Sequence, residues 1–147
     1  MDSDLYPLLP NVAFKRKISG NCCPEAFCAC QGAGDGSPVA PDRLIEGDPS
    51  PVAWNLYTDV TGQFFAGQWA AGPGRWRVVY EPHEEEFCVL LEGRVELTDR
   101  QGATRSFAAG DAFVVPGGFE GIWHNLTPVR KHYAIMNLQQ FDSTSSS

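Results

Sequence analysis

The chain has 147 residues, of which 43% are hydrophobic, and a formal net charge of −7. This length and composition suit one domain with a buried core. The acidic balance disfavours nucleic acid and anionic membrane surfaces as partners, because both bind clustered Lys and Arg. No stretch approaches the ~18 consecutive apolar residues of a transmembrane helix. The acidic N-terminus also lacks the features of a signal peptide, so we expect a cytoplasmic protein.

Residues 1–50 show no lasting period of 2 or 3.6, so we expect an irregular arm, with one short strand at most, that lies on the barrel or on a partner subunit. Four cysteines gather in it, as a Cys-Cys pair followed by Cys-x-Cys: Cys22, Cys23, Cys28 and Cys30. Cytoplasmic thiols stay mostly reduced, and this spacing differs from the paired Cys-x-x-Cys of zinc ribbons. Incidental free thiols are the preferred interpretation, and a zinc site or redox chemistry stays open.

Residues 51–141 are predicted to form the folded domain, because short apolar segments alternate with turn signals every ~8–12 residues. Many Gly and Pro residues also favour β architecture over helix bundles. The polar residues 142–147 are expected to be a flexible tail. Strands are predicted at 53–59, 64–71, 76–81, 86–92, 94–98, 104–107, 112–115, 121–126 and 131–138.

Glycine-containing turns separate these strands. Gly72-Pro73-Gly74 breaks one pair, and Glu92-Gly93 and Asp99–Gly102 are each predicted to close a hairpin. Gly110 is predicted to adopt a positive φ in a tight turn.

The strand at 86–92 has two different sides. Glu86, Cys88 and Leu90 share one side, while Phe87, Val89 and Leu91 share the other. Both sides are apolar at mid-strand, which suits one side in a barrel and the other under a covering strand or a dimer partner. Glu84 and Glu85, just before this strand, are expected to be solvated.

Two segments resemble the two cupin motifs. The first motif ends in a Glu, six residues and a Gly, which Glu86 and Gly93 satisfy. In the second motif, Gly110, Pro116, Gly118 and Asn125 fall in register, after a gap of 16 residues at 94–109. The resemblance implies an all-β, double-stranded β-helix (a jelly-roll, RmlC-like cupin barrel), and by analogy a homodimer.

The residues around the two motifs make the resemblance more specific and extend it over residues 51–138. Gly67-Gln68-Trp69, Gly121-Ile122-Trp123 and Arg130-Lys131-His132-Tyr133 are similar to a cupin subfamily. That subfamily includes the ureidoglycine aminohydrolase cupin domain and an ethanolamine-utilisation protein. The first of these implies a ureide substrate and manganese.

The histidines of metal-binding cupins are missing from this chain. The motif-two position is Gly121, and the two motif-one positions fall on Tyr80 and Pro82, or on Val79 and Glu81. Only Glu86 remains of four expected ligands, whereas tight binding needs at least about three. We therefore expect no metal in the usual position and no cofactor. A shifted site using His83 or His124 is the alternative, which strand alternation disfavours.

An inward Glu86 without a metal must be paired or have a shifted pKa. Lys131, Arg77 or a substrate amine are the candidate partners, and the pair serves either acid–base chemistry or a structural ion pair. Cys88 beside this carboxylate would have a raised pKa, which favours a buried residue over a nucleophile. An aromatic set forms either a pocket wall or core packing: Trp69, Trp76, Tyr80, Trp123 and Tyr133.

These features predict a protein that binds a small molecule inside the barrel near Glu86 and Trp123. The alternative is an enzyme acting on a small amine, amide or ureide, with Glu86 as general acid or base and Lys131, Arg77 or Tyr133 orienting the substrate. A metal-dependent enzyme with a shifted site is a third hypothesis. The predicted ligand-binding residues are Trp69, Arg77, Tyr80, Cys88 and Trp123.

Overall fold

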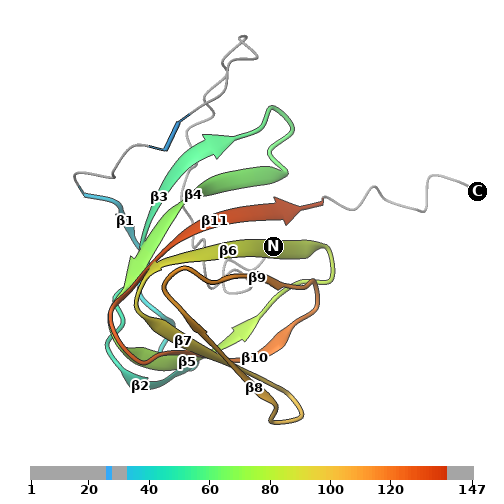
Figure 1. The fold of residues 1–147 in the computed structure, drawn as a ribbon. Coiled ribbons are helices and arrows are strands. Elements are labelled where there is room, and N and C mark those ends of the chain that lie inside the picture. Colours follow the sequence, from blue (N-terminus) through green and yellow to red (C-terminus); the bar gives the residue numbers. More distant parts are fainter. Residues whose placement is uncertain (1–25, 28–32, 139–147) are drawn as a thin grey trace, which may run out of the picture.

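The computed structural model describes residues 26–27 and 33–138, which form eleven strands and no helix (Figure 1). This part of the chain therefore contains no helix able to cross a membrane. The all-β prediction is confirmed. The strands are β1 (Asp35–Gly36), β2 (Leu44–Gly47), β3 (Val52–Thr58), β4 (Phe64–Ala71), β5 (Gly74–Val79), β6 (Glu84–Glu92), β7 (Arg94–Asp99), β8 (Thr104–Ala108), β9 (Ala112–Val115), β10 (Glu120–Asn125) and β11 (Val129–Asn137).

Two antiparallel sheets face each other. The six-stranded sheet has the order β1-β3-β4-β11-β6-β9, and the five-stranded sheet has the order β2-β5-β10-β7-β8. Figure 1 shows β11 between β4 and β6, above the second sheet. Buried side chains from both sheets form one core. This arrangement is the double-stranded β-helix that the motifs predicted.

The nine predicted strands correspond to β3 through β11, with ends that differ by at most two residues. Within residues 1–50 the sequence analysis allowed for one short strand without placing it, and the structure has two there, β1 and β2. β1 pairs with β3, and β2 pairs with β5, so each extends one sheet. β2 lacks a readable pattern because all four of its residues are exposed and its pairing shifts register after Leu44.

The turn at Gly93 differs from the prediction. β6 pairs with β11 and β9, and β7 pairs with β10 and β8, so Glu92-Gly93 joins the two sheets and closes no hairpin. Gly93 has φ +92°, and a Cβ there would lie 2.2 Å from the Pro128 carbonyl oxygen. The motif-one glycine is thus required by this crossing.

The other predicted turns are confirmed. β7 and β8 form a hairpin, in which Asp99 Oδ1 accepts hydrogen bonds from the backbone N–H groups of Gln101 and Ala103, both at 2.9 Å. Gly110 has φ +96°.

The outward sides of the two sheets differ in character. Register with the inward residues places Phe87, Val114 and Met136 on the outward side of the six-stranded sheet, and all three are exposed. The outward side of the five-stranded sheet instead carries Arg75, Glu96 and His124.

Candidate functional site

A charged pair lies in the barrel interior. β6 and β11 are neighbours, and regular alternation turns Glu86 and Lys131 inward from them. The Lys131 Nζ atom lies 3.2 Å from Glu86 Oε1 and 3.3 Å from Oε2. Both side chains are completely buried. Lys131 is therefore the partner of Glu86.

Two further polar groups contact the same carboxylate. The Tyr80 hydroxyl donates to Glu86 Oε1 at 3.0 Å, and the Cys88 thiol donates to that oxygen at 3.1 Å. Burial, followed by the negative charge of Glu86, raises the pKa of Tyr80 and of Cys88 well above their ordinary values. Both groups therefore act as hydrogen-bond donors near neutral pH, and Cys88 is no thiolate nucleophile.

Indole rings surround the ammonium group. Lys131 Nζ lies 4.2 Å from the Trp123 ring centre and 4.7 Å from that of Trp69, within the range of cation–π attraction. Trp76 stacks on Trp123, with ring centres 6.4 Å apart. The motif-two residue Asn125 holds Trp123 in place, because its Oδ1 atom accepts from Trp123 Nε1 at 2.8 Å. Sequence reasoning missed this role of Asn125.

Arg77 and Tyr133 do not join this group. Arg77 is exposed, because its neighbours Trp76 and Val78 point into the core and the strand alternates. The prediction that Arg77 lies in the site was therefore wrong. Tyr133 is buried, but its hydroxyl donates to Asn55 Oδ1 at 2.9 Å, toward β3.

The histidines discussed for a shifted metal site also lie apart from Glu86. His83 belongs to the turn before β6, where its carbonyl accepts from Leu138 N. His124 lies on the outward side of β10, with its ring nitrogens 3.8 Å from Glu46 and 3.7 Å from Glu96.

Glu84 corrects another expectation. Its side chain is only 4% exposed, because β6 begins at Glu84 and places it on the same inward side as Glu86. Burial, with smaller contributions from the charges of Glu86 and Glu81, raises its pKa to about 8. Because Glu84 and Glu86 are two residues apart, alternation predicts that both point inward. This prediction required knowing that the strand starts at Glu84.

The residues of the barrel do not fit the metal that other cupins hold. A Cβ at Gly121 would lie 2.0 Å from the Thr98 carbonyl oxygen, so this position has no space for a histidine side chain. The Lys131 ammonium already provides a positive charge at Glu86. Within residues 26–27 and 33–138, no group of three or more His, Cys, Asp or Glu is placed to hold a metal ion. The cysteines at 22–30 lie outside the described residues.

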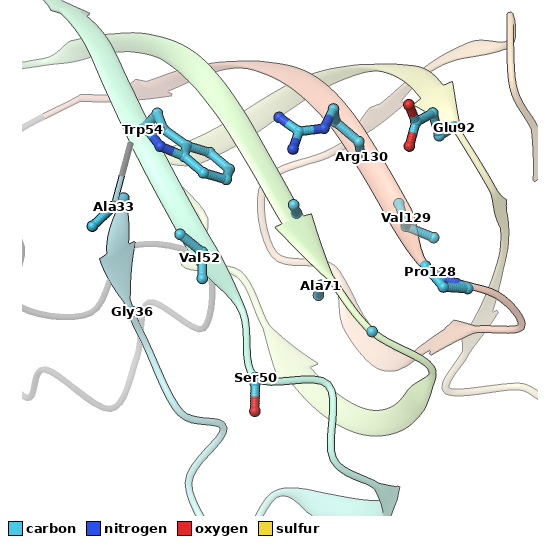
Figure 2. Close-up of a pocket in the computed structure, with 13 residues that line it drawn as sticks. Ala33, Gly36, Ser50, Val52, Trp54, Ala71, Glu92, Pro128, Val129 and Arg130 are labelled. Atoms are coloured by element: carbon cyan, nitrogen blue, oxygen red, sulfur yellow. The ribbon is translucent and has the colours of Figure 1, made fainter. Parts of the chain in front are cut away.

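Glu86 and Lys131 line neither of two hollows at the surface of the described residues. One of about 580 Å³ lies against β3, β4 and β11. In it the Arg130 guanidinium lies 5.0 Å from the ring centre of Trp54 (Figure 2). The other, which we call the β8–β9 hollow, has a volume of about 510 Å³ and includes Phe113 in its lining. Because both side chains are completely buried, a ligand must displace other side chains to reach Glu86 and Lys131.

Solved structures share this fold. A protein of unknown function in the DUF861 family from Pseudomonas syringae is 28% identical, with a TM-score of 0.64, over 75% of this chain and 46% of that one. The chain thus spans less than half the length of that relative. A putative ethanolamine utilization protein EutQ from Salmonella typhimurium is 18% identical, with a TM-score of 0.55, over 74% of this chain and 100% of that one. EutQ from Clostridium difficile is 14% identical, with a TM-score of 0.52, over 67% and 69%.

The low identity of the two EutQ proteins supports the fold alone. No curated protein matches the chain. Residues 58–133, more than half of the chain, match the EutQ-like cupin domain. Together with the barrel, its three motif glycines at positive φ and the buried Glu86, this match shows that the chain belongs to the EutQ-like cupin family.

Proposed function

We propose that this cupin binds a small molecule inside the barrel, with Lys131 and Glu86 as its polar anchor. The observation that carries the proposal is the convergence of an ammonium, a carboxylate, a hydroxyl and a thiol within one indole-walled interior. Ligand sites combine apolar walls with a few placed polar groups in this way. A buried ion pair is weak support for stability alone, since apolar residues of similar volume often stabilise a core as well.

The pair favours a particular kind of ligand head group. Lys131 offers a donor and Glu86 an acceptor, side by side and with no net charge between them. A head group that carries an N–H next to a carbonyl, or an amine next to another acceptor, matches both. Such a ligand would separate Lys131 from Glu86 and replace their contacts with its own. Amides and amines are therefore the first chemical classes to examine.

An enzyme acting on such a ligand is the second candidate, and Glu84 favours it. Glu84 and Glu86 point inward from the same strand, and the pKa of Glu84 is raised to about 8. A carboxyl group that keeps its proton near neutral pH can act as an acid beside a second carboxyl group. Glu86 would then move a proton to or from the bound amide, amine or ureide, and Glu84 would hold a proton near neutral pH.

Calorimetric titration with small amides and amines tests the proposal. We expect any ligand of the wild-type protein to lose affinity at least ~10-fold in Lys131→Met and in Glu86→Gln, since each variant leaves a buried partner unmatched. Arg77→Met is the matched control, because this cation lies on the exposed side of β5. A ligand whose affinity survives both interior substitutions binds elsewhere and overturns the proposal.

A further inference from the structure

The β8–β9 hollow lies where the two sheets are not joined. In the described part of the chain, β8 pairs only with β7, and β9 pairs only with β6, so each is the last strand of its sheet. The hollow between them holds about 510 Å³, which is enough for a small organic molecule. Its lining is apolar, with the phenyl rings of Phe107 and Phe113, apart from the charged side chains of Asp99 and Arg105.

One side chain connects this hollow with the interior pair. Phe113 lines the hollow, and its ring centre also lies 6.2 Å from that of Trp123. Trp123 in turn lies 4.2 Å from Lys131 Nζ. On its other side, Phe113 stacks on Phe107 with ring centres 4.0 Å apart. Rotation of this single side chain would open the hollow toward Trp123 and Lys131.

The charges in the hollow point to an anionic group. Asp99 places a negative charge in the lining, and its Oδ1 atom accepts hydrogen bonds from the backbone N–H groups of Gln101 and Ala103 in its own turn. Arg105 is exposed, and within the described residues no carboxylate lies within ion-pair distance of its guanidinium. The remaining walls are apolar, with two phenyl rings. Arginine binds carboxylates in a bidentate manner, so a flat apolar body with a carboxylate fits this lining.

We infer that the β8–β9 hollow is the outer half of the ligand site, that Arg105 binds a carboxylate there, and that Phe113 controls access to Lys131 and Glu86. This inference rests on the proposed function. It deepens it by specifying a ligand with a carboxylate at one end and an amide or amine at the other.

Quenching of tryptophan fluorescence tests the route. In a Trp54→Phe background the remaining tryptophans, Trp69, Trp76 and Trp123, are all buried. We expect Phe113→Ala to raise the acrylamide quenching constant several-fold, and Phe113→Leu to raise it less. Phe87→Ala is the matched control, because Phe87 is exposed on the opposite side of the six-stranded sheet. Equal quenching in the folded Phe113 variants and the control would overturn the route.

Benzoate tests the anion assignment. We expect benzoate to raise the melting temperature of the wild-type protein and of Lys131→Met, and to have no effect on Arg105→Gln. An unchanged response of Arg105→Gln, or no response of the wild-type protein, overturns the assignment. If Lys131→Met loses amide binding but the expected benzoate and quenching results are absent, the proposed function stands and the ligand enters by another route. If benzoate binds through Arg105 but no amide or amine binds inside the barrel, the proposed function at Lys131 and Glu86 is wrong, while the anion site at Arg105 remains.

Discussion

The ammonium nitrogen of Lys131 lies 3.2 Å and 3.3 Å from the two carboxylate oxygens of Glu86, and neither side chain reaches solvent. Each charge is compensated mainly by the other, because water cannot solvate either one. We therefore expect Lys131→Met to reduce the free energy of unfolding by about 3–5 kcal/mol, as it leaves an unpaired buried carboxylate. Urea unfolding at pH 7 measures this loss.

The double variant Lys131→Met/Glu86→Gln is the control for that prediction. Removing both charges should recover most of the stability, leaving a loss of roughly 1–2 kcal/mol. Additive losses from the two single substitutions would contradict the coupling that the geometry indicates.

Glu84 should make stability fall as pH rises. Its folded pKa of about 8 lies above the usual value of 4.5, so the folded state holds the proton more tightly. Its contribution to stability is therefore full below pH ~4.5, declines between pH 4.5 and 8, and is lost above pH ~8. We expect Glu84→Gln to be more stable than the wild-type protein at pH 9 by roughly 4 kcal/mol, and similar to it at pH 5. Urea unfolding at both pH values, with the exposed Glu85→Gln as control, measures the difference.

Restoring the motif-two histidine should not create a metal site. A Cβ at position 121 meets a backbone carbonyl at 2.0 Å, and backbone cannot move aside as a flexible side chain can. We expect Gly121→His to lose at least ~3 kcal/mol of stability, with no recovery in the presence of Zn²⁺ or Mn²⁺. Thermal unfolding with each metal and with chelator checks this, and Gly36→His, where a Cβ meets nothing within 4 Å, controls for the histidine itself. A stoichiometric, stabilising metal in Gly121→His would contradict the prediction.

The outward side of the six-stranded sheet leads us to expect the homodimer that the family resemblance implied. Phe87 is 48% exposed and Val114 57%, on neighbouring strands, while the outward side of the other sheet is charged. Exposed apolar groups of this kind mark interaction surfaces. We expect light scattering to give twice the chain mass, and Phe87→Glu with Val114→Glu to give a monomer that remains folded. A wild-type monomer at micromolar concentration would contradict this expectation.

The strands and the barrel could be predicted because turn glycines and the spacing from Glu86 to Asn125 are local properties of the chain. Inward positions followed from alternation, which correctly joined Glu86 with Cys88. Arg77 was placed in the site because alternation was not applied to its strand. With Trp76 pointing inward, alternation would have placed Arg77 on the outward side. Glu84 was misjudged because its burial depends on a strand start two residues earlier than predicted. The sequence offered Lys131 as one of several partners for Glu86. It could not single out Lys131, because the pairing depends on β11 lying beside β6.

The position of β11 also constrains how the molecule assembles. It lies between β4 and β6, yet it is the last of the described strands in chain order. During synthesis, the six-stranded sheet would remain split into two parts until residues 129–137 have left the ribosome. Glu86 would lack its cation for the same period. Assembly should therefore be a single late event, in which strand insertion and charge neutralisation occur together and earlier fragments have no stable barrel.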